Sequence, residues 1–81
     1  MKEHNKVFLR ECALYIKGEV SSVKLRGDSR ATRLFAEAIS SSRKFYLTLQ
    51  EGDFNKVIPA LKDKRDASKA LREQTGYIWP L

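Results

Sequence analysis

Cysteine, histidine and long apolar runs are scarce in this chain of 81 residues, and each shortage excludes a class of protein. A lone Cys12 can form neither an intrachain disulfide nor a cysteine-rich zinc site. His4 has no second histidine with which to bind a metal ion. No segment approaches the roughly 18 apolar residues of a membrane span, and the polar residues 1–5 are unlike a signal peptide. The sequence therefore predicts a cytoplasmic protein without metal, cofactor or membrane association.

The composition is that of one small, basic, folded domain. Hydrophobic residues make up 42% of the chain and charged residues 32%, a balance that favours a folded core over disorder. The length of 81 residues is too short for two domains. Sixteen lysines and arginines against ten acids give a net charge of +6, which indicates a polyanionic partner. We expect a single domain over residues 1–81.

Changes in apolar periodicity at Gly18, Gly27, Gly52 and Gly76 divide the chain into segments. Before Gly18, the spacing of Phe8, Cys12 and Ile16 predicts a helix over 5–17, with a strand as the alternative. The next segment holds Val20, Val23 and Leu25, with Lys24 and Arg26 on the face opposite Val23 and Leu25, which predicts a strand over 19–26.

Two long helices are predicted to follow. Asp28 or Ser29 can cap a helix of about twenty residues that ends at Gly52, although alternation over 43–49 leaves a strand there as an alternative. Asp53 can cap the next helix, which either begins near Ile58 or kinks at Pro59, and which ends at Gly76. The short connection between them predicts an antiparallel hairpin.

The apolar tail over 77–81 is expected to pack on the core, so the predicted fold class is α+β and mainly helical. The strand needs a partner. That partner is the tail, the first segment, or a second copy of the chain. A homodimer through 19–26, or through the apolar side of the hairpin, is therefore one expectation, and a monomer closed by the tail is the other.

No arrangement of residues indicates catalysis. Cys12 lies on the apolar face with no histidine near it in sequence, which is typical of a buried structural thiol. Asp63 and Asp66 lie among lysines and arginines, where solvated ion pairs explain them. We expect a protein that is not an enzyme.

Positive charge is segregated on the last helix. Its cations are spaced 3, 4 and 3 residues apart and form one stripe, made of Lys62, Arg65, Lys69 and Arg72. Asp63, Asp66 and Glu73 form the neighbouring stripe. The stripe is either a polyanion-binding surface or a solvated face in which Lys62 pairs with Asp66, and Lys69 with Glu73.

A second basic group surrounds the start of the long helix. It consists of Lys24, Arg26, Arg30 and Arg33, and Arg43 and Lys44 extend it. A helix start favours acids rather than cations, so this local misfit indicates contact with nucleic acid or another polyanion, with a merely solvated face as the alternative. Among the aromatic residues, Tyr77 and Trp79 are the candidates for docking on a partner, unless Trp79 seals the core.

The strand ending in Val23-Lys24-Leu25-Arg26-Gly27, the two helices and the ending Thr75-Gly76-Tyr77-Ile78-Trp79-Pro80-Leu81 resemble small accessory proteins of T4-like tailed phages. The resemblance implies a phage-encoded inhibitor of a host ribonuclease toxin that acts together with RNA in the host cytoplasm. It assigns no functional residues.

Two function hypotheses follow. The first is a module that binds nucleic acid, RNA more than DNA, through phosphates, because no motif for base readout is present. The second is a protein-binding inhibitor of a host enzyme whose positive face docks on an acidic surface and whose anchors are Tyr77 and Trp79.

Overall fold

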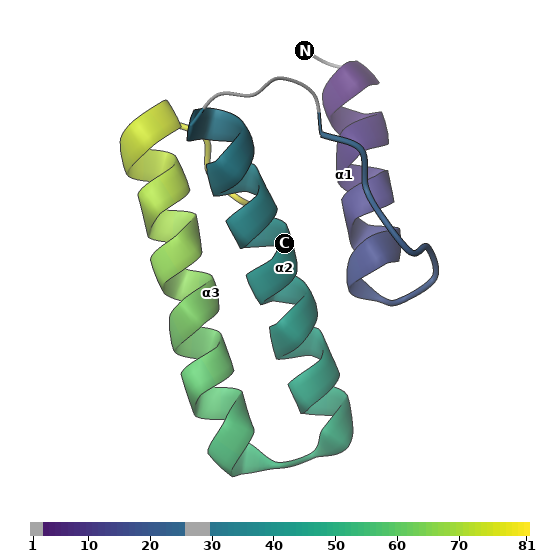
Figure 1. Cartoon of the computed structure of the whole chain (residues 1–81), viewed down its shortest axis with the longest axis vertical. Coiled ribbons are helices and arrows are strands. Elements are labelled where there is room, and N and C mark those ends of the chain that lie inside the picture. Colours follow the sequence, from purple (N-terminus) through teal and green to yellow (C-terminus); the bar gives the residue numbers. More distant parts are fainter. Residues whose placement is uncertain (1–2, 26–29) are drawn as a thin grey trace.

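The computed structural model describes residues 3–25 and 30–81. It contains three helices, α1 (Glu3–Ile16), α2 (Arg30–Glu51) and α3 (Phe54–Thr75). Helices α2 and α3 form a long antiparallel hairpin, and α1 packs against the outer side of α2 (Figure 1). The predicted hairpin is confirmed. Helix α2 lies between α3 and α1 and contacts both.

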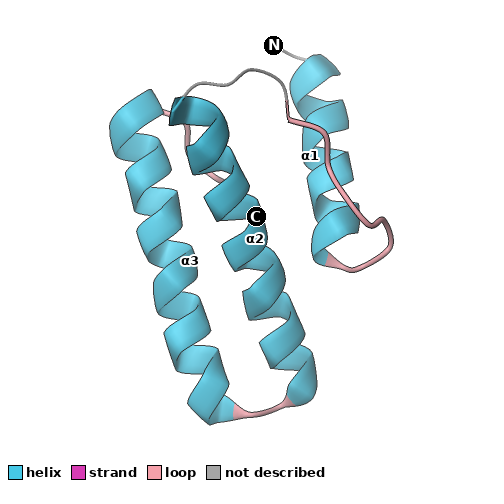
Figure 2. Cartoon of the chain, viewed as in Figure 1, coloured by secondary structure: helices cyan, strands magenta, loops and turns pink. Residues whose placement is uncertain are grey.

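The predicted α+β class is wrong, because the described part of the chain contains no strand (Figure 2). Residues 17–21 form turns and bends, and residues 22–25 have no regular structure. The backbone N–H of Glu19 donates to the carbonyl of Leu14 at 2.8 Å, which folds the segment back onto α1. Val23 and Leu25 pack against the core from this loop. Apolar contact with the core, rather than pairing with another strand, therefore holds this loop in place. A dimer through a strand at 19–26 was predicted, but the described residues 19–25 form no strand that could pair with a second copy.

The first helix was predicted over 5–17, and α1 confirms it in place of the alternative strand. Helix α2 likewise excludes the alternative strand over 43–49. Its buried Thr48 donates to the carbonyl of Phe45 at 2.8 Å, so the hydroxyl is satisfied within the helix. The caps predicted at Asp28 and Ser29, and the turn at Gly27, lie outside the described residues.

Helix α3 begins at Phe54, so of the two alternatives for its start the one near Ile58 is excluded, and Pro59 lies inside the helix. Asp53 caps it as predicted and accepts from the backbone N–H of Asn55 at 3.0 Å. The helix then continues through Pro59. Gly76 ends it in the left-handed conformation at φ 80°, which favours glycine, and its N–H donates to the carbonyl of Arg72.

The core lies where α1, α2, the upper end of α3 and the tail meet. Its buried members are Cys12, Ala38, Ile39, Leu71 and Trp79. Phe35 is at the centre of the aromatic packing, edge-on to Phe8, Tyr77 and Trp79, with ring centroids 5.2–6.3 Å apart. The indole Nε1 of Trp79 donates to the Ser42 hydroxyl at 2.9 Å. The expectation that the tail packs on the core is confirmed.

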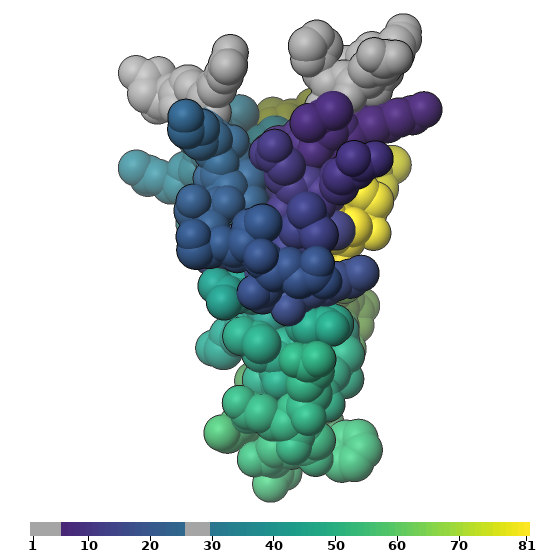
Figure 3. Space-filling model, turned by 90° about the vertical axis from the view of Figure 1, so that its right-hand side faces the viewer, coloured from purple at the N-terminus to yellow at the C-terminus, as the bar shows by residue number. Residues whose placement is uncertain are grey.

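Helix α1 is shorter than the hairpin and covers only the half that carries the tail. Figure 3 shows α1 and its loop over that half, with the hairpin tip extending beyond them. Apolar side chains near the tip are correspondingly exposed: Leu47, Leu49, Phe54 and Ile58. The core is therefore concentrated at the end where α3 meets the tail.

We predict that Ser42→Ala lowers the free energy of unfolding by about 1–3 kcal/mol, because the buried indole N–H of Trp79 loses its acceptor. Ser40→Ala is the matched control, since its exposed hydroxyl bonds only to its own helix. Urea unfolding followed by fluorescence of the single tryptophan measures both. Equal losses in the two variants would show that the indole hydrogen bond contributes nothing.

We also predict a stability loss in alkali that depends on Cys12. Burial, with a smaller contribution from Glu11, raises the pKa of this thiol from 9.0 to about 11. The unfolded chain therefore loses the thiol proton at a lower pH than the folded chain, and stability falls as pH rises from about 9 to about 11. Cys12→Ala lacks this titration, so its unfolding free energy should decline less over the same interval. Parallel pH curves would contradict the prediction.

Candidate nucleic-acid interface

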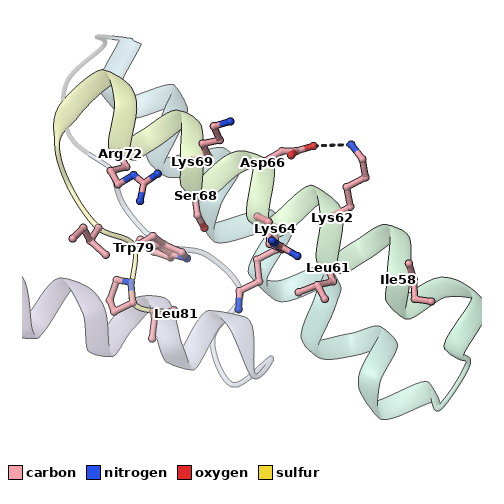
Figure 4. A pocket seen from close by; sticks show the side chains of 13 residues that line it. Ile58, Leu61, Lys62, Lys64, Asp66, Ser68, Lys69, Arg72, Trp79 and Leu81 are labelled. Atoms are coloured by element: carbon pink, nitrogen blue, oxygen red, sulfur yellow. Dashed lines mark hydrogen bonds and ion pairs between the residues drawn. The ribbon is translucent and has the colours of Figure 1, made fainter.

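A groove of about 740 Å³ runs between α3 and the C-terminal tail. Figure 4 shows the tail descending from the end of α3, with Trp79 below the last turns of that helix and Leu81 farther along the tail, toward α1. Five cations line the groove: Lys62, Lys64, Arg65, Lys69 and Arg72. Six apolar residues line it too: Ile58, Leu61, Ile78, Trp79, Pro80 and Leu81. The groove brings together all four cations of the predicted stripe on the last helix.

Helical geometry places these cations in two lines. Arg65 and Arg72 are seven residues apart, so they lie on nearly the same side of α3, and Lys62 and Lys69 share a second side. In Figure 4, Arg72 lies toward the tail, whereas Lys69 and Lys62 point outward from the helix. The two arginines therefore form the inner edge of the groove and the two lysines its outer rim.

Most of this charge is unpaired. Lys62 pairs with Asp66 at 3.0 Å, as the solvated-face interpretation predicted. Within the described residues, Arg65, Lys69 and Arg72 have no carboxylate within 4.0 Å, and the predicted pair of Lys69 with Glu73 is not formed. The three cations are exposed. They remain available to an anion.

Lys64 has a different environment. Its ammonium lies 5.1 Å from the centroid of the Phe45 ring, so it packs across the hairpin as a cation–π contact. It is half-buried on the side of α3 that faces α2. Lys64 therefore contributes positive potential at the floor of the groove while stabilising the hairpin.

The second predicted basic group is not brought to this groove. Lys24 is exposed in the loop after α1, beside a separate depression with Val7 and Phe8. Arg30 and Arg33 are exposed on the first turns of α2. Arg33 is nine residues from Ser42, half a turn around the helix, and Ser42 faces the tail. Arg33 thus lies on the opposite side of α2, while Arg26 lies outside the described residues.

Arg43 and Lys44, the extension of that group, differ from each other although they are adjacent. The guanidinium of Arg43 lies 4.6 Å from the centroid of the Tyr15 ring and joins α2 to α1. Its Nε is buried and has no hydrogen-bond partner among the described residues. Lys44 is exposed. Arg43 therefore acts in helix packing, and Lys44 is a surface cation away from the groove.

The two predicted docking residues belong to the core. Tyr77 is half-buried with its ring 5.2 Å from that of Phe35, and Trp79 is 8% exposed. Docking on a partner through Trp79 would require the tail to leave the core. The structure thus places Trp79 as the residue that seals the core.

Sequence reasoning missed the residues that build the second wall of the groove. Ser42 anchors the tail, and Ile78, Pro80 and Leu81 line the side facing α3. The apolar character of residues 77–81 was a signal that the tail packs, but its position beside the cations depends on one tertiary hydrogen bond. That bond spans residues 42 and 79, and no local pattern reports it.

The described residues contain no group of three or more histidine, cysteine, aspartate or glutamate side chains that could hold a metal ion. Among the same residues, no helix is long and apolar enough to cross a membrane. The buried Cys12 has a pKa raised to about 11, so its thiol stays protonated at neutral pH and is a poor nucleophile.

Comparisons with protein families, with curated proteins and with solved structures found no match for this chain. The resemblance to accessory proteins of T4-like phages stays a prediction. The residues that line the groove are the remaining observation that bears on function.

We predict that Arg43→Ala lowers the free energy of unfolding by about 1–2 kcal/mol, because it removes the cation–π contact with Tyr15 and the packing of its side-chain stem. Lys44→Ala removes the same charge from the next residue and should change stability by less than about 0.5 kcal/mol. Urea unfolding measures the difference. An equal effect of the two substitutions would show that Arg43 is a solvated cation.

Proposed function

We propose that this chain binds RNA through its phosphate backbone, with the cations of the α3 groove as the contact residues. The observation that carries the proposal is the cluster of Arg65, Lys69 and Arg72, which are exposed, unpaired within the described residues and gathered on one groove. Phosphates attract such clusters, and an arginine can donate two parallel hydrogen bonds to one phosphate group.

Folding alone does not account for this cluster. Arg65 and Lys69 are four residues apart, where like charges destabilise a helix by a few tenths of a kcal/mol. The pairing of Lys69 with Glu73 that would offset the repulsion is not formed in the described structure. The arrangement therefore favours a ligand that supplies the missing negative charge.

The helical architecture favours phosphate contact over base readout. In a helix-turn-helix the two helices cross at about 90–120°, whereas α2 and α3 run side by side in opposite directions (Figure 1). None of the three helices in the described part of the chain is thus arranged to enter a major groove in that manner. Binding should depend strongly on salt and weakly on sequence.

A second candidate is a protein-binding inhibitor, favoured by the exposed Ile58 and Ile78 that border the cations. Its proposed anchors, Tyr77 and Trp79, are however packed in the core. The phage resemblance extends either candidate to inhibition of a host ribonuclease toxin. Pull-down from a bacterial lysate with and without ribonuclease treatment separates them, since a bridging RNA is lost on digestion and a direct protein partner is retained.

We predict that the triple variant Arg65→Gln, Lys69→Gln and Arg72→Gln loses most of its RNA affinity. At about 0.7 per neutralised phosphate on a single strand, its slope of log K against log salt should become shallower by about 2. Fluorescence anisotropy with a labelled oligouridine measures both quantities.

The matched control is Arg30→Gln, Arg33→Gln and Lys44→Gln, which removes the same net charge from exposed positions outside the groove. It should weaken binding much less and leave the slope nearly unchanged. If the two triple variants behaved alike, net charge rather than the groove would carry the binding, and the proposal would fail.

A further inference from the structure

We infer that the ligand of this groove is a single strand of nucleic acid rather than a duplex, an inference that rests on the proposed function. The groove has two unlike walls. The α3 wall carries five cations beside Asp66, Ser68, Ile58 and Leu61, whereas the tail wall is apolar throughout. A single strand has the same division, with phosphates along one edge and bases along the other.

The cations on α3 are spaced so that successive phosphates of one strand can each contact one of them. Arg65, Lys69 and Arg72 rise along α3 in steps of about 6 and 4.5 Å, at 1.5 Å per residue. This spacing is comparable with the separation of neighbouring phosphates along an extended strand. The guanidinium groups of both arginines can in addition stack on bases.

The apolar wall is exposed and held in place. Ile78 is 74% exposed, although its neighbours Tyr77 and Trp79 pack in the core. The Trp79 hydrogen bond to Ser42 fixes the end of the tail, and the backbone N–H of Tyr77 donates to the Thr75 hydroxyl at 3.1 Å where the tail leaves α3. The backbone that carries Ile78 is therefore held beside the cations before any ligand binds, so little backbone entropy is lost on binding.

A duplex cannot use both walls. Its bases are stacked inside, so it presents phosphates to the cations and leaves the exposed Ile78 and Pro80 without apolar contact. A single strand can lay its unstacked bases against these side chains while its phosphates meet the arginines. An acidic peptide is favoured less, because tight protein docking relies on anchor residues, and the two aromatic residues of the tail are already buried.

The test compares three labelled probes on the full chain at one salt concentration. The probes are an oligouridine of about twelve nucleotides, a blunt RNA duplex of the same length, and an acidic peptide of alternating glutamate and leucine. We expect the oligouridine to bind about ten-fold more tightly than the duplex, despite the higher charge density of the duplex. The peptide should bind more weakly than the oligouridine.

Ile78→Ala tests the apolar wall directly. It should weaken oligouridine binding about five-fold without changing the salt slope, because it removes apolar contact and no charge. Val7→Ala is the matched control, since Val7 is a comparably exposed aliphatic residue beside a different depression. It should leave affinity unchanged.

The outcomes separate the two proposals. A duplex that binds as tightly as the oligouridine, or an Ile78→Ala variant that binds like the control, overturns the single-strand inference and leaves phosphate binding intact. A peptide that binds more tightly than either RNA overturns both in favour of protein docking. Absence of binding to both RNA probes overturns the proposed function itself.

Discussion

The hydrogen bond from the Trp79 indole to Ser42 is the interaction on which this architecture depends. It joins two residues 37 positions apart and is buried between the tail and α2. Without it, the buried indole N–H of Trp79 would lose its acceptor, and a buried polar group left unpaired destabilises the fold. With it, the tail lies beside α3 and converts a solvated helix face into a groove with two chemically different walls.

The buried core of this short chain is small, and its aromatic contacts lie at the same end of the molecule as the Trp79–Ser42 hydrogen bond. The largest fully buried side chains are Leu71 and Cys12, and the distal half of the hairpin lacks a covering helix. Edge-on packing of Phe35 with three other rings concentrates apolar contact at one end. Stability and the candidate site thus arise in the same part of the molecule, since Trp79 belongs to both.

Local signals predicted the helices well and the loop poorly. The Asp53 cap, the Gly76 stop and the apolar spacing of α2 are each determined by neighbouring residues, so sequence reasoning recovers the hairpin. Val20, Val23 and Leu25 also follow a strand pattern, but a strand requires a partner. Here the chain turns back onto α1 at Glu19, and Val23 and Leu25 pack, partly buried, against the core from a loop instead.

For the site, spacing along α3 correctly grouped Lys62, Arg65, Lys69 and Arg72 on one surface. Arg30 and Arg33, in the second basic group, are exposed on α2 and do not line this groove. Nearness in sequence says nothing about which side of a helix faces the tail. Arg43 shows the same difficulty, because its contact with Tyr15 depends on how α1 docks.

The most direct test of the account is the map of NMR amide and indole shifts on titration with oligouridine. Binding in the groove predicts changes confined to residues 62–72 and 77–81, together with the Trp79 indole N–H. Changes centred on Lys24, Arg30 and Arg33, with the tail and α3 unperturbed, would contradict it.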